Sequence, residues 1–239
     1  MGKTVLVTGA SSGIGEATCR LLVENGFRVA GTSRDPQRLA PLAQQLGEAF
    51  SPLALDVNDP SAVTSLPSAL PSDFGGLDVL VNNAGHDTGG RRPFEDTDPD
   101  AMHSVIETNV QGLFRVTRAL IGGMLEQGSG HIVNIGSEVG MYPVASMGAY
   151  VASKYAVHGF SETLRLEYAG RGVRVTEIMP GRVRTGFAEQ RLGDAGLAKE
   201  FYDSYPQCLE ATDIAGSVLY ALQQPAHVEV AQLLIVPTS

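Results

Sequence analysis

The sequence predicts an α/β fold built on a parallel sheet, and two observations support this. Short β-branched runs alternate with helix-length segments along the whole chain of 239 residues, as expected when helical crossovers join parallel strands. A glycine-rich loop follows directly on the first run and opens a helical pattern. The runs place strands near residues 3–8, 27–33, 50–55, 77–82, 130–136, 172–179 and 232–236. No boundary interrupts the alternation, so we expect residues 1–239 to form one domain.

Helices are expected between the strands. The stretch 99–127 carries an apolar stripe at helical spacing, which is typical of a face buried in the core. A second long helix is expected around Tyr150, and the two helices together offer a subunit interface. Residues 186–205 lack a clean period and contain three glycines. These features suit a mobile lid of short helices that covers a binding site.

Composition argues against several classes of protein. With 43% hydrophobic and 18% charged residues, the chain has enough apolar material for a sizeable core. A net charge of -9 argues against a nucleic-acid-binding surface, which needs clustered Lys and Arg. Cys19 and Cys208 fall in no metal or redox spacing, so we expect reduced thiols, no bound metal and a cytoplasmic location. Neither a signal peptide nor a membrane span is expected.

The glycine-rich loop has the context of a dinucleotide-binding motif. The run Val5–Val7 leads into Gly9, Gly13 and Gly15, and a helical pattern follows from Ile14. Gly9 permits a tight turn, Gly13 lets the backbone approach a pyrophosphate, and Gly15 allows close helix packing. The amide groups of the helix N-terminus then bind the anion.

The end of the second strand determines which nucleotide is preferred. An acidic residue there would bind the ribose 2′-hydroxyl and repel a 2′-phosphate. The sequence instead has Thr32 and Ser33 followed by Arg34, whose guanidinium matches a phosphate with a bidentate fork. NADP(H) is therefore the predicted cofactor. The alternative, that Arg34 is a solvated loop charge or pairs with Asp35, stays open.

Tyr150 and Lys154 are four residues apart, so a helix places the phenol and the ammonium on one face. A nearby cation stabilises the phenolate, which lowers the tyrosine pKa from its free value of about 10 and makes the group a usable general acid/base. The same spacing also occurs on solvated helix faces. Further motifs in the chain favour the catalytic interpretation.

Those motifs occur along the chain in a fixed order. They are Thr8–Gly15, Leu55–Val57, Asn82–Gly85, Asn109, Ser137, Tyr150–Lys154 and Pro180–Thr185. In this order and spacing the chain resembles the short-chain dehydrogenase/reductase family over essentially its whole length. The resemblance implies a doubly wound (Rossmann) sheet of seven parallel strands with helices on both faces, assembled as a homotetramer or homodimer.

The resemblance also implies a cofactor site. Asp56 is expected to accept from the adenine amino group, with a turn role as the alternative. Asn83 and Gly85 are expected to flank the cofactor ribose, and Thr185 to bind the nicotinamide carboxamide. Many NADP-using relatives have a basic residue where this chain has Ser12, so use of NAD(H) stays open. The full expected set is Gly9, Ser11, Ser12, Gly13, Ile14, Gly15, Ser33, Arg34, Asp56, Val57, Asn83, Ala84, Gly85, Tyr150, Lys154, Pro180, Gly181, Val183 and Thr185.

The implied reaction is hydride transfer between the nicotinamide and a small carbonyl or alcohol, with Tyr150 as general acid/base. Ser137 is expected to hydrogen-bond the substrate oxygen, and Lys154 to bind the nicotinamide ribose. Asn109 is expected to hold a water that links the lysine to solvent. Two alternatives remain: a non-catalytic NADP-sensing module, and epimerisation or dehydration on the same fold.

Substrate contacts are predicted from position alone. His86 follows Asn82–Gly85 near the expected pocket mouth, where it contacts either the substrate or, as an ordinary loop residue, solvent. Met141 lies shortly after Ser137 and Phe187 falls in the lid, so both are expected in the pocket wall. An apolar and aromatic wall fits a modest carbonyl compound.

Overall fold

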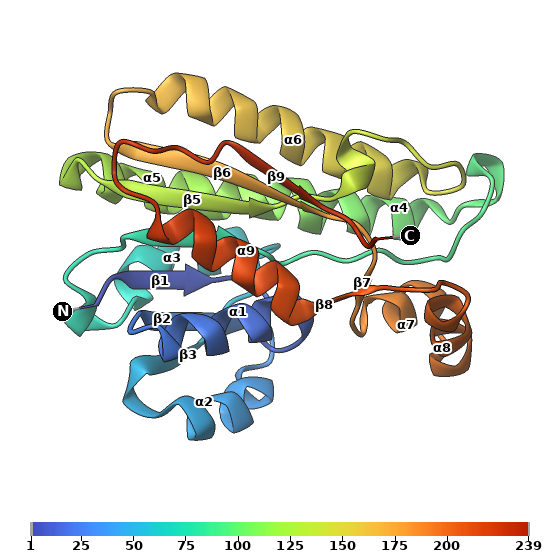
Figure 1. Ribbon diagram of the computed structural model, residues 1–239, viewed down its shortest axis with the longest axis horizontal. Coiled ribbons are helices and arrows are strands. Elements are labelled where there is room, and N and C mark those ends of the chain that lie inside the picture. Colours follow the sequence, from blue (N-terminus) through green and yellow to red (C-terminus); the bar gives the residue numbers. More distant parts are fainter. Residues whose placement is uncertain (1, 239) are drawn as a thin grey trace.

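The computed structural model describes residues 2–238, which form a central sheet covered by helices on both faces (Figure 1). Seven strands lie in the order β3-β2-β1-β4-β5-β6-β9, and every neighbouring pair is parallel. The strands are β1 (Thr4–Val7), β2 (Arg28–Ser33), β3 (Phe50–Ala54), β4 (Val79–Asn82), β5 (Gly130–Ile135), β6 (Val173–Pro180) and β9 (Gln232–Ile235). The predicted doubly wound sheet of seven parallel strands is confirmed.

Helices fill the intervals, as predicted. They are α1 (Gly13–Glu24), α2 (Ala40–Leu46), α3 (Pro60–Ala69), α4 (Pro99–Ile106), α5 (Leu113–Gln127), α6 (Gly148–Tyr168), α7 (Phe187–Leu192), α8 (Ala195–Asp203) and α9 (Ala211–Gln223). Short helical turns are η1 (Pro36–Leu39), η2 (Gly47–Ala49), η3 (Ser72–Phe74), η4 (Phe94–Asp96), η5 (Glu107–Gly112) and η6 (Glu138–Gly140). A small parallel pair, β7 (Val183–Arg184) with β8 (Leu209–Glu210), was not predicted and brackets α7 and α8.

The alternation of side chains along each strand supplies two separate cores. On β1, Val5 and Val7 pack on one face with Leu22 of α1, whereas Leu6 packs on the other face with Val116 of α5. All five side chains are fully buried. Because both faces are covered, the strand reads as a continuous apolar run. Each such side chain contributes about 1.5–3 kcal/mol through its removal from water.

The direction in which successive strands are added reverses after β3: β2 and β3 lie on one side of β1, and β4 lies on its other side. Val5 of β1 pairs with Val29 of β2 on one side and with Val79 of β4 on the other. The chain therefore leaves the adjacent strands β1 and β4 in opposite directions, and a crevice opens outside their carboxyl ends. This topology brings the glycine loop beside the segment Asn82–Gly85.

The predicted helix over 99–127 is interrupted by a π-helical segment. Asp98 caps α4 by accepting from the amide of Asp100 at 3.1 Å, and Gly128, with φ of 68°, ends α5. Between them η5 has π-helical hydrogen bonding and contains Asn109. Such segments occur frequently at functional sites, and the apolar periodicity of the sequence gives no sign of this one.

Candidate active site

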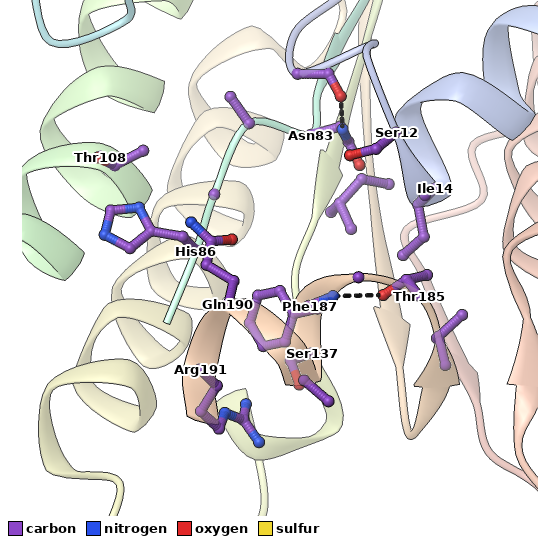
Figure 2. A pocket seen from close by; sticks show the side chains of 18 of the residues that line it. Ser12, Ile14, Asn83, His86, Thr108, Ser137, Thr185, Phe187, Gln190 and Arg191 are labelled. Atoms are coloured by element: carbon purple, nitrogen blue, oxygen red, sulfur yellow. Dashed lines mark hydrogen bonds between the residues drawn. The ribbon is translucent and has the colours of Figure 1, made fainter. Parts of the chain in front are cut away.

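A pocket of about 1100 Å³ opens at the carboxyl ends of the strands. The loop after β1, the ends of β2, β4 and β5, and helices α6 and α7 all contribute to its wall (Figure 2). Pockets for drug-sized ligands measure about 300–1000 Å³. The space is therefore sufficient for a dinucleotide together with a small second molecule.

The glycine loop forms a cradle that leaves no room for side chains. Gly9 and Gly13 have φ of 66° and 56°, a region that other residues rarely adopt. A Cβ on Gly15 would lie 2.3 Å from the carbonyl oxygen of Gly9. Ser12 begins α1 without a side-chain cap, so the first amide groups of the helix remain available to an anion. These features fit the pyrophosphate of a dinucleotide.

Asn83 fixes the shape of this cradle (Figure 2). Its Nδ2 donates to the carbonyl oxygens of Thr8 at 2.9 Å and Gly9 at 3.1 Å. In return, the Thr8 hydroxyl accepts from the amide groups of Asn83 and Ala84, each at 3.0 Å. The ends of β1 and β4 are thus locked together, and the side chain of Asn83 shapes the site expected to hold the ribose.

The nucleotide end of the pocket carries two arginines. Arg34 follows the buried Ser33 at the end of β2, and Arg38 of η1 lines the same pocket. Asp35 caps η1 by accepting from the amide of Gln37 at 3.0 Å, and no ion pair joins it to Arg34 within residues 2–238. Sequence analysis missed Arg38, although its four-residue spacing from Arg34 was an available signal. Two guanidinium groups suit a 2′-phosphate.

Asp56 and Val57 line the pocket after β3. The Oδ1 atom of Asp56 accepts from the amide of Asn58 at 2.9 Å, so the turn role named as the alternative is present. A carboxylate has a second oxygen that can still accept from a ligand. Gly15 lies beneath the loop and not on the wall, but the other expected cofactor residues all line the pocket.

Tyr150, Lys154 and Ser137 lie together in the pocket wall. Tyr150 and Lys154 are buried on α6, with Lys154 Nζ 5.7 Å from the centre of the Tyr150 ring. Nζ also donates to the carbonyl oxygen of Ile135 at 2.9 Å. Ser137 follows β5, and its hydroxyl donates to the carbonyl oxygen of Pro180 at 3.4 Å. The arrangement sets a phenol, an ammonium and a hydroxyl against one cavity.

Burial dominates the protonation of both ionisable groups. Removal from water raises the pKa of Tyr150 to about 12, against the opposing effects of the Arg191 charge and the Ser137 hydroxyl. Burial lowers the pKa of Lys154 to about 8, while Glu177 acts to raise it. The sequence predicted that Lys154 would make Tyr150 more acidic, but the largest cationic effect comes from Arg191. Tyr150 is accordingly a protonated phenol at neutral pH.

Asn109 contacts the loop after β4 and lies outside the pocket wall. Its Oδ1 accepts from the amide of His86 at 2.9 Å, and its Nδ2 donates to the carbonyl oxygen of His86 at 2.9 Å. Nδ2 also donates to Ser153 Oγ of α6 at 3.1 Å. Asn109 therefore clamps this loop to α6, and its water relay stays a prediction.

Two of the three predicted substrate residues line the pocket. The Phe187 ring packs 5.5 Å from the Tyr150 ring, measured between centroids. His86 also lines the pocket, and its Nε2 lies 2.9 Å from Ser104 Oγ of α4. The residue is half-buried, and its contact with the substrate stays a prediction. Burial and the charge of Arg34 lower the pKa of His86, so the ring is neutral at neutral pH.

Met141 is the third predicted substrate residue, and the structure places it elsewhere. Its side chain is 37% exposed and lies outside the pocket wall, because the turn η6 separates it from Ser137. Val144 and Met147, further along the same segment, line the pocket instead.

Sequence analysis missed Arg191 of α7, which lines the pocket beside Tyr150. Its guanidinium carbon lies 5.4 Å from the centre of the Tyr150 ring and 5.0 Å from that of Phe187. Its Nε lies 2.6 Å from Asp87 Oδ2, and both side chains are less than a tenth exposed. An arginine in an aperiodic segment gives no signal of burial, because only tertiary packing brings it to Asp87.

Comparisons with known proteins agree with this geometry. The family model for short chain dehydrogenases matches residues 3–195. A probable NADP-dependent dehydrogenase of Haemophilus influenzae is 38% identical over 238 residues, covering 99% of this chain and 94% of the relative. The NADP-dependent 3-hydroxy acid dehydrogenase YdfG of Salmonella typhi is 39% identical over 237 residues, covering 98% and 95%. The solved closed form of serine dehydrogenase complexed with NADP+ has a TM-score of 0.94 at 38% identity, covering 97% and 94%.

These relatives agree with the predicted preference for NADP(H). Within residues 2–238, no cluster of His, Cys, Asp or Glu suits a metal ion, and no helix is long and apolar enough to cross a bilayer. With the fold, the family model and the relatives in agreement along the chain, the protein belongs to the short-chain dehydrogenase/reductase family and is an NAD(P)-dependent dehydrogenase acting on CH–OH groups.

Proposed function

We propose that the protein transfers a hydride between NADP(H) and a small carbonyl compound or alcohol, with Tyr150 as the general acid/base. The observation that carries this proposal is the grouping of Tyr150, Lys154 and Ser137 in one pocket with the glycine cradle. The names of two relatives, a 3-hydroxy acid dehydrogenase and a serine dehydrogenase, favour a small hydroxylated substrate.

The pocket residues fit the cofactor from end to end. The open amide groups of α1 would hold the pyrophosphate, and Arg34 with Arg38 would hold the 2′-phosphate. Thr185 Oγ1 accepts from the amide of Phe187 at 3.2 Å, which links the expected carboxamide site to α7 (Figure 2). When bound, the cofactor supplies or accepts the hydride.

Side chains of the protein donate and accept the proton of the reaction. In reduction the Tyr150 phenol donates its proton to the carbonyl oxygen, while the Ser137 hydroxyl hydrogen-bonds that oxygen and stabilises its developing charge. In oxidation the phenolate accepts the alcohol proton. Because burial raises the pKa of Tyr150 to about 12, donation is favoured at neutral pH and oxidation gains as the pH rises. Lys154 supplies the positive charge beside the ring.

Two further parts of the proposal concern the lid and the assembly. Helices α7 and α8, bracketed by β7 and β8, form a lid within 186–205 that closes over the bound substrate. We also propose a dimer or tetramer in the cytoplasm, assembled through α5 and α6. Light scattering coupled to size-exclusion chromatography would measure the mass, and a monomer would contradict the assembly.

The test is absorbance of the reduced nicotinamide, with NADPH and NADH in parallel, across aldehydes, ketones, diketones and keto acids, plus alcohols with NADP. We expect consumption of NADPH with one substrate class. Tyr150→Phe should then lower kcat by about 10³-fold while NADPH affinity is retained. The matched control is Tyr155→Phe on the same helix, whose hydroxyl donates to the Met141 carbonyl oxygen and which lies outside the pocket wall. A near-normal rate for Tyr150→Phe would remove Tyr150 from the mechanism.

The same assay separates the two alternatives. Tight NADPH binding without turnover across the panel would favour an NADP-sensing module. Product formation without net cofactor consumption would favour epimerisation or dehydration.

A further inference from the structure

The pocket holds a buried cation that hydride transfer does not require. Arg191 is 9% exposed, lines the pocket and lies with its guanidinium carbon 5.4 Å from the centre of the Tyr150 ring. In Figure 2 it extends beside Phe187 at the end of the pocket that holds Ser137. Tyr150 and Ser137 are the groups proposed to meet the reacting oxygen. The cation therefore lies beside the reacting part of the substrate.

Asp87 engages only one edge of this guanidinium. Its Oδ2 lies 2.6 Å from Arg191 Nε, and its Oδ1 accepts from the amide of Thr88 at 3.0 Å. Asp87 is buried and lies outside the pocket wall, so the cavity meets the guanidinium and not the carboxylate. Within residues 2–238, neither terminal nitrogen of Arg191 donates a hydrogen bond to the protein, and the contact of the guanidinium with Asp87 is made through Nε.

We propose that Arg191 binds an anionic group of the substrate, so that the enzyme selects short carbonyl compounds and alcohols that carry a carboxylate. This inference rests on the proposed function. The two terminal nitrogens present a fork that matches a carboxylate, and burial strengthens each charge-assisted bond relative to water. Because the guanidinium carbon lies 5.4 Å from the centre of the Tyr150 ring, the carboxylate would bind close to the reacting carbon, as in a short hydroxy acid.

Neighbouring groups hold Arg191 in this orientation and do not compete with it. The Phe187 ring lies 5.0 Å from the guanidinium carbon, and the amide of Gly90 donates to the Arg191 carbonyl oxygen at 2.9 Å. The ammonium of Lys154 donates to the Ile135 carbonyl. His86 is neutral at neutral pH, because burial and Arg34 lower its pKa. Asp87 is a positioning residue that acts through Arg191.

The experiment compares oxidation of 3-hydroxybutanoate with that of its methyl ester, using NADP and the full chain. The wild type should prefer the acid in kcat/KM by more than about tenfold, and Arg191→Gln should lose about 100-fold on the acid, mainly through KM. The ester should change less than about threefold, because it carries no charge. The control is Arg118→Gln, an exposed arginine of α5 outside the pocket wall, which should leave both substrates nearly unchanged. Equal losses on acid and ester in Arg191→Gln would overturn the inference.

A binding measurement keeps the test independent of turnover. Malonate is titrated calorimetrically into the NADPH complexes of the wild type and Arg191→Gln, whose retained NADPH affinity verifies folding. Binding by the wild type that is lost in Arg191→Gln supports the anion site, even if neither substrate reacts and the proposed function fails. Turnover of the ester without preference for the acid would support the proposed function but overturn the anion site. Failure of the wild type to bind malonate would also overturn the anion site.

Discussion

The two ends of the pocket are built in different ways. At the cofactor end, the contacts come from residues that directly follow β1, β2 and β4, and positive φ angles such as the 66° of Gly9 fix the backbone. At the substrate end, contacts join distant segments: Asp87 lies against Arg191, and the Phe187 ring packs on Tyr150. The comparison teaches that the ends of the strands shape the cofactor end of the pocket, whereas the other end is shaped by α7 and the loop after β4, which pack against each other.

The largest effect is expected where the cofactor end has no room to adapt. In Gly15→Val the new Cβ would lie 2.3 Å from the Gly9 carbonyl oxygen and 2.5 Å from Asn83 Nδ2. Because backbone must move, we expect a loss of about 3 kcal/mol in unfolding free energy and no detectable NADPH binding. Thermal unfolding with and without NADPH measures both. The control is Gly122→Ala in α5, where the added Cβ meets nothing within 4 Å. If NADPH still raised the Tm of Gly15→Val, the glycine loop would not be the site that binds the cofactor.

A smaller effect separates the two nucleotides. Arg34→Asp should weaken NADPH binding about 100-fold but NADH binding less than about threefold, because only NADPH brings a 2′-phosphate to this end. Fluorescence titration of both reduced cofactors provides the measurement. Arg118→Asp, which places the same charge change on the exposed side of α5, is the control. Equal losses for both cofactors would show that Arg34 does not read the phosphate, and Arg38 would be the next residue to replace.

The contrast between the two ends also explains which features the sequence could predict. Strand runs, the glycine loop, Arg34 and the Tyr150–Lys154 pair are local patterns with local physical causes, and the structure places them as expected. The π-helical hydrogen bonding of η5 leaves no mark on the apolar periodicity, and the Asp87–Arg191 contact depends on packing between segments distant in sequence. Met141 was expected in the pocket because it is near Ser137 in sequence, but the turn η6 separates the two residues and leaves the Met141 side chain exposed.

A third prediction concerns the effect of the sheet on the pKa of Lys154 in α6, which the pH profile tests. Glu177 is fully buried in β6, and its charge raises the pKa of Lys154, which burial lowers to about 8. Glu177→Gln removes that charge, so Lys154 should lose its proton at lower pH, and the basic limb of kcat/KM for reduction should move down by about one pH unit. His158→Gln removes the ring that lies 2.7 Å from Glu177 but leaves the carboxylate, so it is the control. If the basic limb of kcat/KM stayed at the same pH in Glu177→Gln, ionisation of Lys154 would not be the cause of that limb.

The smallest effect is expected at His86, where the loop after β4 meets the substrate end. Asn109 holds the backbone of His86 through two hydrogen bonds of 2.9 Å, so His86→Ala leaves the loop in place and removes only the contact of the ring with Ser104. One lost hydrogen bond costs about 1 kcal/mol of stability, and we expect KM to change less than about threefold. Ser104→Ala removes the same bond from α4 and provides the comparison. Equal effects of the two variants on kcat/KM would show that the imidazole acts only by anchoring the loop to Ser104 of α4. A larger loss in His86→Ala alone would mean that the neutral imidazole contacts the substrate, since the two variants differ only in the side chain that lines the pocket.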